Sequence, residues 1–231
     1  MGENGQLQAY LDCLGIKYTG SGFASCLAAM DKNLSKTIFC AAGVPTAGWV
    51  YCKAEEAEEK NICFPCVIKP CSCGSSVGVT MVDTAEEMSA ALEAAKKYED
   101  NIIIEEKLCG REFSIGVLAG RTLPAIEIRP KGEGFYDFTK KYKAGLTEEI
   151  CPAPLTEEQA SRLSELALCA HKALGLGDYS RIDFILDEEK GDFYCLEANT
   201  LPGMTPLSLL PMAAKAAGIS YEELCEKIIE L

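Results

Sequence analysis

Two strand-like stretches near the C-terminal end are the most informative part of this chain: SRIDFILD at residues 180–187 and FYCLEANTLPGMT at residues 193–205. Side chains of a β-strand point alternately to its two faces. In the first stretch, Arg181 and Asp183 therefore share one face, while apolar residues occupy the other. In the second, Glu197 and Asn199 share a face in the same way. The alternation predicts two strands that each carry a polar face.

The polar run at residues 188–192 separates the two stretches and predicts a hairpin turn. If Asp187 and Phe193 face each other across this turn, the register places Asp183 directly opposite Glu197. Directly opposed side chains in an antiparallel pair have Cβ atoms about 4.5 to 5.5 Å apart, and like charges at that distance are destabilising. We therefore expect a cation between the two carboxylates.

The same register pairs Arg181 with Asn199. The two carboxylates and the Asn199 amide oxygen form an all-oxygen set that suits Mg²⁺, an ion that keeps several waters and is often completed by substrate phosphates. The alternative is a solvent-exposed hairpin face with scattered charges. The apolar opposite face and the unusual loop at residues 200–205 favour the metal site.

The bulk composition is that of a globular protein. The 231 residues are 48% hydrophobic, enough to bury one large core or two smaller ones. The formal net charge of −13 argues against nucleic acid or an anionic membrane as the main partner. No run approaches the roughly 18 apolar residues that a membrane span needs.

Thirteen cysteines and a single histidine are present. The cysteines do not form paired Cys-x-x-Cys motifs, and Cys71 with Cys73 is the nearest approach to one, so neither a zinc site nor a disulfide framework is indicated. Residues 1–6 lack the basic and apolar regions of a secretory signal. We therefore expect a cytoplasmic protein with free thiols in a reducing compartment.

Helices and strands are expected in groups joined by hairpins rather than in regular alternation, which favours the α+β class. Three capping-box patterns predict helix starts at Thr84, Thr156 and Ser220. Apolar and β-branched runs bounded by Gly or Pro predict further strands at residues 65–70, 77–82, 101–105 and 112–118.

We expect two α+β units that divide near Glu105. The smaller, central unit covers residues 21–105, and the larger, C-terminal unit covers residues 106–231 with the acidic hairpin. Residues 1–20 hold a short helical stripe ending at Gly15 and are too few for a domain. They are expected to be either an N-terminal extension or the remnant of a substrate domain whose beginning is absent.

The stretch KPCSCGSSVG at residues 69–78 predicts a small Gly- and Ser-rich loop between two strands. Its backbone N–H groups and hydroxyls could cradle phosphates, with Lys69 supplying charge. It is not a Walker A loop, because the Gly-Lys-Ser/Thr ending and the following helix are missing. An ordinary Gly/Ser turn is the alternative. The carboxylate hairpin strengthens the phosphate interpretation.

Two further lysines, Lys32 and Lys141, could reach the same anion, although each is equally consistent with a solvated surface residue. Lys141 lies in an aromatic loop, residues 135–142, that is long enough to act as a lid. The strand end at residues 104–108 could offer backbone edges to a base, with Glu112 positioned for ribose hydroxyls.

Taken together, these segments closely resemble the D-alanine–D-alanine ligases, a family of ATP-grasp enzymes. The matching motifs run in order along nearly the whole chain: Gly2-Glu3-Asn4-Gly5, Met30-Asp31-Lys32 with Lys36, Ile68-Lys69-Pro70, Gly74-Ser75-Ser76-Val77-Gly78, Gly110-Arg111-Glu112-Phe113, Phe135-Tyr136-Asp137 with Lys141-Tyr142, Arg181-x-Asp183-Phe184, and Glu197-x-Asn199-Thr200-x-Pro202-Gly203-Met204-Thr205. So many ordered matches argue against chance similarity.

The resemblance implies an ATP-grasp fold in which ATP lies between the two units. The implied nucleotide contacts are Lys32, Lys69, Lys141 and the loop residues Gly74, Ser75 and Ser76 at the phosphates, Glu105 and Leu108 at the adenine, and Glu112 at the ribose. The implied ligands of two Mg²⁺ ions, which Mn²⁺ could replace, are Asp183, Glu197 and Asn199.

The resemblance also implies the reaction. One D-alanine carboxylate attacks the γ-phosphate of ATP to give an acyl phosphate, and the amine of a second D-alanine then displaces phosphate. Arg181 would stabilise the oxyanion of the tetrahedral intermediate, and Glu3, Ser75 and Tyr142 would tie the lid over the site. The expected substrate contacts are Arg181, Gly203, Ser208 and Leu209, with Ser208 holding the carboxylate of the second substrate.

The implied partners are ATP and D-alanine, without nucleic acid or a membrane, in peptidoglycan precursor synthesis and so in cell-wall formation and cell shape. A homodimer is an expectation that the residues themselves do not show. Tyr142 favours D-alanine or D-serine over D-lactate as the second substrate.

Family members carry a further domain before the position of Glu3, so the chain is expected to be truncated at its N-terminus. Two alternatives stay open. One is another ATP-grasp ligase that joins a different acid and amine, such as a D-alanine–D-serine ligase. The other is an inactive nucleotide-binding fragment.

Overall fold

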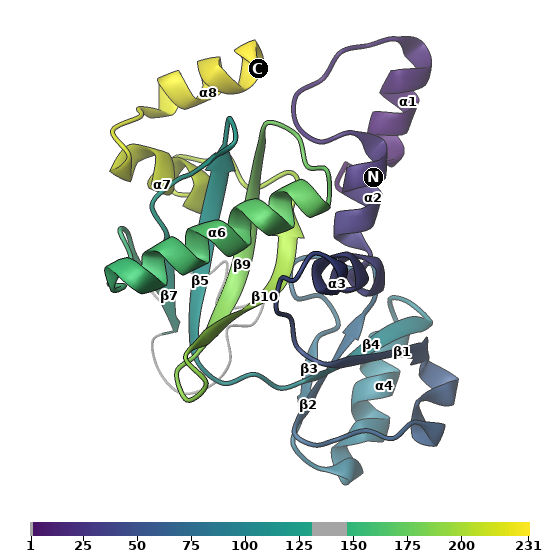
Figure 1. Cartoon of the computed structure of the whole chain (residues 1–231). Helices are drawn as coiled ribbons and strands as arrows, with labels where there is room; N and C mark the ends of the chain where they lie inside the picture. The colour runs from purple at the N-terminus through teal and green to yellow at the C-terminus, as the bar shows by residue number, and fades with distance from the viewer. Residues whose placement is uncertain (1, 131–146) are drawn as a thin grey trace.

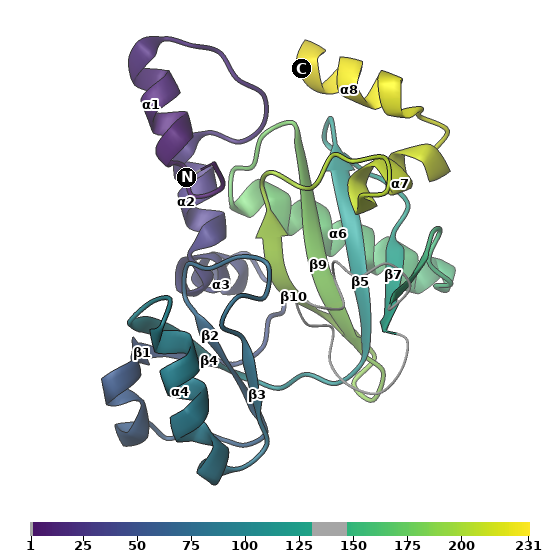
Figure 2. The same ribbon diagram turned by 180° about the vertical axis from the view of Figure 1, so that it is seen from behind.

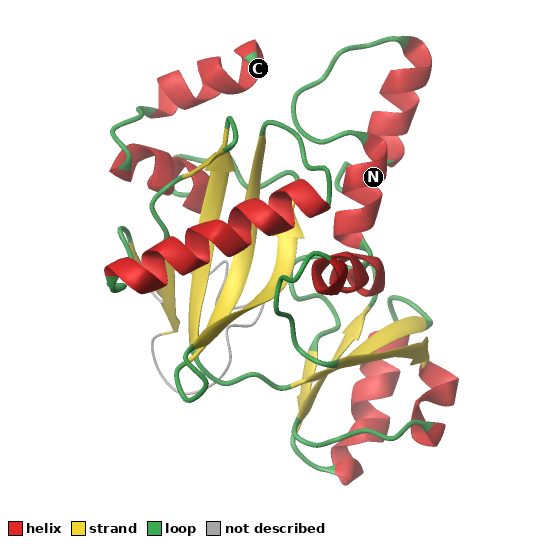
Figure 3. Ribbon diagram, in the orientation of Figure 1, coloured by secondary structure: helices red, strands yellow, loops and turns green. Residues whose placement is uncertain are grey.

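The computed structural model of the chain describes residues 2–130 and 147–231. Within these ranges the strands form a four-stranded and a six-stranded sheet, and their pairings are antiparallel. Figure 3 shows helices lying beside both sheets. The α+β prediction is therefore confirmed.

The four-stranded sheet consists of β1 (Trp49–Lys53), β2 (Cys66–Pro70), β3 (Thr80–Val82) and β4 (Asn101–Glu106), in the order β1-β4-β2-β3. The helix α4 (Met88–Lys96) covers one face of it (Figure 2). Ile68, Ile102 and Ile104 belong to the hydrophobic cluster of this unit, because β-branched side chains pack well on a pleated surface. Two 3₁₀ turns, η1 (Ala54–Glu59) and η2 (Ala85–Glu87), complete this part.

The six-stranded sheet consists of β5 (Arg111–Leu118), β6 (Arg121–Thr122), β7 (Ile126–Pro130), β8 (Thr147–Ile150), β9 (Tyr179–Asp187) and β10 (Asp192–Asn199). Its order is β10-β9-β5-β7-β8, with β6 paired to β5. The long helix α6 (Glu157–Ala173) crosses one face (Figure 1), and α7 (Leu209–Ala216) lies on the other (Figure 2), followed by α8 (Tyr221–Glu230).

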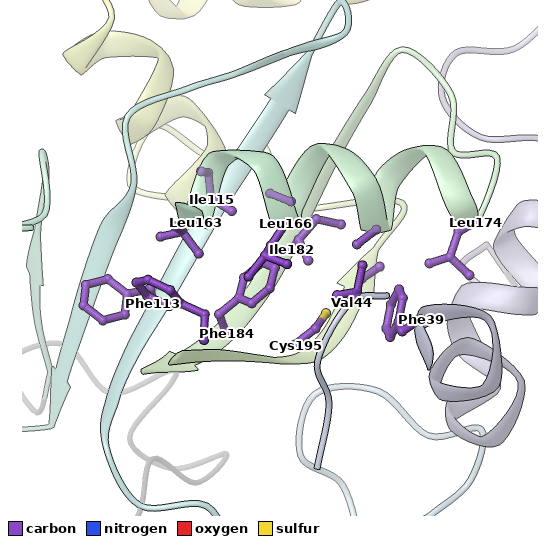
Figure 4. Packing of buried hydrophobic residues seen from close by; sticks show 14 of the residues in the cluster. Phe39, Val44, Phe113, Ile115, Leu163, Leu166, Leu174, Ile182, Phe184 and Cys195 are labelled. Atoms are coloured by element: carbon purple, nitrogen blue, oxygen red, sulfur yellow. The ribbon is translucent and has the colours of Figure 1, made fainter. Parts of the chain in front are cut away.

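The main core lies between α6 and the six-stranded sheet (Figure 4). Phe193 packs edge-to-face on Phe113 and Phe184, with ring centroids 5.7 and 6.5 Å apart, the geometry that aromatic pairs prefer. Leu163 of α6 is fully buried in the same cluster. Removing such apolar surface from water contributes about 2 to 3 kcal/mol per large side chain.

Two helices from the first part of the chain, α2 (Phe23–Met30) and α3 (Lys32–Ala41), also reach this core. Phe39 of α3 and Val44 just after it are buried beside Cys195 of β10 (Figure 4). The predicted smaller unit, residues 21–105, therefore shares a hydrophobic cluster with the larger sheet, and the proposed boundaries at 21 and 105 stay a prediction.

The β9–β10 hairpin reaches the predicted pairing by a different route from the one expected. Asp187 pairs with Asp192 rather than with Phe193, because the connecting loop is one residue shorter than predicted. A register shift between Cys195 and Glu197 then restores the frame. As a result, Asp183 does pair with Glu197, and Arg181 with Asn199. The bulged residue of this shift is Leu196.

The helix starts follow the capping patterns in two of three cases. The side chains of Thr156 and Ser220 each accept a hydrogen bond from the backbone N–H three residues on. The side chains of Gln159 and Glu223 accept in turn from the backbone N–H of the cap residue, so both capping boxes are confirmed. The capping box predicted at Thr84 does not form, because the Thr84 side chain makes no capping hydrogen bond, although a helix does begin at Met88. A 3₁₀ turn intervenes before α4, and Glu87 accepts instead from the backbone of Asp83, at 2.8 Å.

The helix α1 (Gln6–Leu14) ends at Gly15 as its sequence predicts, with Gly15 in the left-handed conformation at φ 67°. Its apolar stripe is not buried, since Leu7 and Leu14 remain about half exposed. Over the described ranges, none of the helices combines the length and the hydropathy that a bilayer crossing requires.

A buried ion pair ties β7 to the start of β5. Glu127, which is 1% exposed, accepts hydrogen bonds from Arg111 at 2.8 and 2.9 Å and from Arg129 at 2.8 Å. The hydrogen bonds from Arg111 hold the pKa of Glu127 at about 2, although its burial acts in the opposite direction.

Because this pKa lies below that of the unfolded chain, the ionised Glu127 stabilises the fold above about pH 4.5, and its contribution is lost as the pH falls toward 2. Glu127→Gln should therefore lower the free energy of unfolding at pH 7 by about 2 kcal/mol, a value reduced for solvent screening of the half-exposed Arg129. It should also flatten the dependence of stability on pH between about 4.5 and 2.

Urea unfolding across that pH range measures both effects. Glu93→Gln, at an exposed carboxylate of α4, is the matched control and should change stability by less than about 0.5 kcal/mol. An unchanged pH profile in Glu127→Gln would contradict the assignment.

Candidate functional site

A hollow opens where the small sheet, the N-terminal segment and the end of β10 meet. The residues that line it come from segments far apart in the sequence: Glu3, Ala29, Met30, Lys32, Gly74, Ser75, Glu197, Ala198, Asn199, Thr200 and Leu201. The fold thus brings one predicted phosphate-binding lysine, the Gly/Ser loop and two of the predicted metal ligands to a single place.

Asp183 is the most heavily bonded carboxylate at this site. It is 5% exposed and accepts bonds from Arg181 Nε and Nη2 at 3.0 and 2.8 Å. Ser114 Oγ donates to it at 2.8 Å, and Asn199 Nδ2 donates at 3.0 Å. The Arg181 guanidinium thus neutralises one carboxylate of the opposed pair, and the cation expected between Asp183 and Glu197 stays a prediction. Asn199 donates through its amide nitrogen, so its amide oxygen remains an acceptor.

Ser114 is a site residue that the sequence reasoning missed. It is buried on β5, directly opposite Asp183. A signal was available, since Ser114 lies two residues from Glu112 in a predicted strand and therefore shares its face. Without the strand order, however, the alternation could not show that β5 pairs with β9.

The loop between β2 and β3 adopts a strained backbone at the predicted phosphate contacts. Ser75 and Ser76 both have positive φ, 55° and 57°, which is uncommon for residues other than Gly and costs of order 1 kcal/mol each. Lys32, at the start of α3, donates through Nζ to the carbonyl oxygen of Cys73 and is thereby held against this loop.

Cys71 and Cys73 lie in the first part of this loop, and all thirteen thiols of the chain are free. Cys71 is 1% exposed, and its Sγ contacts Asp31 Oδ1 at 3.3 Å. Burial raises the pKa of the Cys71 thiol to about 11. It is therefore a packing residue and not a reactive thiolate.

Glu105 lies at the centre of a buried ionic cluster. Lys69 Nζ is 2.6 Å from its Oε2, and Lys36 Nζ is 3.6 Å from its Oε1. Burial by itself would raise the pKa of Glu105, but the nearby Lys69 and Lys36 outweigh it and hold this pKa below its usual value. Burial lowers the pKa of Lys36. Among the described residues, Glu105 Oε1 accepts no hydrogen bond.

The remaining predicted residues fall into three groups. Leu108 and Glu112 are half-buried at and just after the connection from β4 to β5. Ser208 occupies the N-cap position of α7, immediately before Leu209, but its side chain makes no capping hydrogen bond. Its Oγ accepts instead from Thr205 N at 3.1 Å. A Cβ added at Gly203 would lie 2.8 Å from Ser208 Oγ, so the loop packs closely there. Lys141 and Tyr142 lie outside the described residues.

No group of three or more His, Cys, Asp or Glu side chains in residues 2–130 and 147–231 is arranged to hold a metal ion alone. The donor set at the hairpin consists of the carboxylates of Asp183 and Glu197 and the amide oxygen of Asn199. Such a set suits a hard cation that takes its other ligands from water and a phosphate-bearing substrate.

The family profile and the most similar sequences all point to one protein family. The sequence profile described as "D-ala D-ala ligase C-terminus" matches residues 38–230. A D-alanine–D-alanine ligase of Geobacter sulfurreducens is 46% identical over 99% of this chain and 73% of its own length. The ligase of Methylacidiphilum infernorum is 43% identical over 100% of this chain and 75% of its own.

Solved structures agree. The D-alanine–D-alanine ligase of Bacillus anthracis complexed with ATP superposes with a TM-score of 0.84 at 34% identity, covering 99% of this chain and 74% of that one. The VanG D-Ala:D-Ser ligase of Enterococcus faecalis superposes with a TM-score of 0.88 at 32% identity, covering 100% and 69%.

Ser114→Ala tests the geometry of the hairpin without any assumption about activity. Loss of the hydroxyl leaves a buried carboxylate with one donor fewer, so we expect the free energy of unfolding to fall by about 1 to 2 kcal/mol. Chemical denaturation measures this change. Ser161→Ala, at an exposed serine of α6, is the control and should have an effect below about 0.5 kcal/mol. Equal stability of the two variants would remove Ser114 from the network.

Proposed function

This chain belongs to the D-alanine–D-alanine ligase family, and from that premise we propose that it joins two D-alanine molecules into D-alanyl-D-alanine as ATP is converted to ADP and phosphate. It is thus an ATP-dependent ligase with the ATP-grasp fold. The dipeptide serves peptidoglycan precursor synthesis, and so the building of the cell wall.

The observation that carries this proposal is the shared hollow. Lys32, Gly74 and Ser75 line it together with Glu197 and Asn199. Positive charge and backbone N–H groups suit phosphates, whereas carboxylates and an amide oxygen suit the cation that accompanies them. The hollow therefore holds side chains of both kinds, which supports an Mg–ATP site there.

The proposed reaction requires both the phosphate-binding groups and the cation-binding groups. A carboxylate does not accept an amine until one of its oxygens becomes a good leaving group. The carboxylate of the first D-alanine attacks the γ-phosphate, ADP leaves, and an acyl phosphate forms. The amine of the second D-alanine then attacks the acyl carbon, loses a proton, and phosphate departs. Because the first step joins two anions, positive charge at the γ-phosphate lowers its barrier.

We assign that charge to Lys32 and Lys69, with Lys141 as a third contributor. Lys32 is 8% exposed, and its Nζ donates to Cys73 O in the loop between β2 and β3. We propose that this loop, with Gly74, Ser75 and Ser76, binds the phosphates. Lys69 is held by Glu105, so both lysines are oriented before the nucleotide binds. For the base, we propose Glu105 and Leu108, and for the ribose Glu112. The buried Glu105 Oε1 supports this, because the amino group of adenine is a suitable donor for it.

Asp183, Glu197 and Asn199 fit Mg²⁺ by the chemistry of their donor atoms, and Mn²⁺ prefers the same donors. We propose that these three residues hold two such ions. When bound, the ions supply further positive charge at the phosphates. Arg181, which already lies against Asp183, is proposed to stabilise the oxyanion in the second step.

The family resemblance supports the residues proposed to close the site and those proposed to bind the second D-alanine. We propose Glu3, Ser75 and Tyr142 as the residues that close the site against water, which would otherwise hydrolyse the acyl phosphate. Glu3 and Ser75 line the same hollow, which supports two members of this set. For the carboxylate of the second D-alanine we propose Ser208, with Gly203 and Leu209 beside it. A cytoplasmic location and a homodimer are further proposals.

A coupled assay of ADP release tests the reaction directly. The chain is supplied with Mg–ATP and, in turn, D-alanine, D-serine or D-lactate as second substrate. We expect D-alanine to stimulate ADP release most strongly and D-alanyl-D-alanine to accumulate in equal amount. Calorimetry with Mg–ATP separates binding from turnover. Binding without stimulation by any acid would replace the ligase assignment with that of a nucleotide-binding fragment.

Glu197→Gln keeps the shape of the side chain and removes its charge. We expect metal-dependent ADP release to fall by at least about 100-fold, because the cation loses an anionic ligand, while the circular dichroism spectrum and the unfolding midpoint stay close to wild type. Glu226→Gln, at an exposed position of α8, is the matched control and should retain full activity. Retained activity in Glu197→Gln would remove this residue from the site.

A further inference from the structure

The side chains of β10 change faces along the strand. Phe193 and Cys195 point into the core beneath α6, as does Ala198 after them. Strict alternation would place Glu197 on that same core face, opposite Ile182. The register shift between Cys195 and Glu197 instead turns Glu197 toward Asp183. The bulge therefore decides whether Glu197 faces the hollow or the hydrophobic core.

A loop from the other end of the chain holds this bulge from outside. β10 is an edge strand of its sheet, so its outward backbone groups need partners elsewhere. Cys195 N donates to Pro45 O at 2.7 Å, and Thr46 Oγ1 donates to Cys195 O at 2.8 Å. One short loop thus holds both outward backbone groups of Cys195, two residues before Glu197.

The Thr46 hydroxyl is oriented in turn by Lys36. Lys36 is 1% exposed, and its Nζ lies 2.6 Å from Thr46 Oγ1, 3.1 Å from Ala47 O and 3.6 Å from Glu105 Oε1. An ammonium group only donates, and a hydroxyl has one proton. The direction is therefore set: Lys36 donates to Thr46, and Thr46 donates its proton to the Cys195 carbonyl.

We propose that the Lys36–Thr46 pair is a positioning device for the metal ligand Glu197. It connects Glu105 on β4 of the small sheet to the bulge of β10 in the large sheet, and so fixes Glu197 relative to the nucleotide site. This proposal rests on the proposed function of the hollow. The alternative is that the pair only satisfies buried polar groups at the junction between the two sheets.

Thr46→Val removes the hydroxyl and keeps the branched shape, whereas Thr46→Ser keeps the hydroxyl. Thr37→Val removes an exposed hydroxyl from the same helix as Lys36 and is the matched control. Mn²⁺ binding in the presence of ADP, followed by electron paramagnetic resonance, reads out the metal ligands without turnover. The free energy of unfolding and the steady-state constants are measured in parallel.

We expect Thr46→Val to weaken Mn²⁺ binding and to lower kcat by at least about tenfold each, the usual effect of losing a group that orients a ligand. KM for ATP should change by less than about threefold. Thr46→Ser should restore both quantities to near wild type, and Thr37→Val should change neither. If Thr46→Val does not fold, Thr46→Ala replaces it, since it lacks the hydroxyl and adds no bulk.

The proposal would be overturned if Thr46→Val were less stable but bound Mn²⁺ as tightly as wild type. It would also be overturned if Thr46→Ser failed to restore Mn²⁺ binding and kcat. Absence of D-alanine ligation in every protein, wild type included, would overturn the proposed reaction instead. The comparison of Mn²⁺ binding would still decide the positioning role, because it requires only the metal and ADP.

Discussion

The pairing of Asp183 with Glu197 across the β9–β10 hairpin is the constraint on which the rest of the structure depends. Two carboxylates on directly opposed positions repel each other, and partial burial makes their repulsion stronger than in water. This repulsion is offset by hydrogen bonds that Asp183 accepts from Arg181, Ser114 and Asn199. The β5–β9 pairing is needed to bring Ser114 there, so the order of the central strands is tied to the polar site.

A second cluster of buried charge lies where the two sheets meet. The side chains in this cluster are each at most 15% exposed: Lys36, Glu105 and Lys69. Removing a charge from water costs several kcal/mol, which the attraction between the charged partners offsets only in part. Apolar side chains of similar volume would often be as stable. The cluster is therefore better explained as an arrangement that fixes geometry, since Lys69 and Glu105 are the residues proposed to contact the nucleotide and Lys36 is linked to β10 through Thr46.

Local sequence patterns predicted the elements in which one rule dominates. The apolar alternation of β9 and the capping boxes at Thr156 and Ser220 depend on neighbours within a few residues, and these were confirmed. The cap at Thr84 failed because a 3₁₀ turn precedes the helix, and capping patterns do not distinguish the two. Short strands such as β7 and β8 carry mixed polar and apolar residues, so their sequences show no clear period.

The sequence by itself determined the class of the fold, the polar faces of the two hairpin strands and the oxygen-bearing side chains that those faces carry, because alternation and residue chemistry are local properties. Only the tertiary structure decided how Glu197 comes to face Asp183. The turn is one residue shorter than predicted, and a bulge restores the register. That bulge is held by two hydrogen bonds of Cys195, which donates to Pro45 O and accepts from Thr46 Oγ1, about 150 residues away in the chain. Contacts of such sequence separation leave no periodic signal in the strand itself.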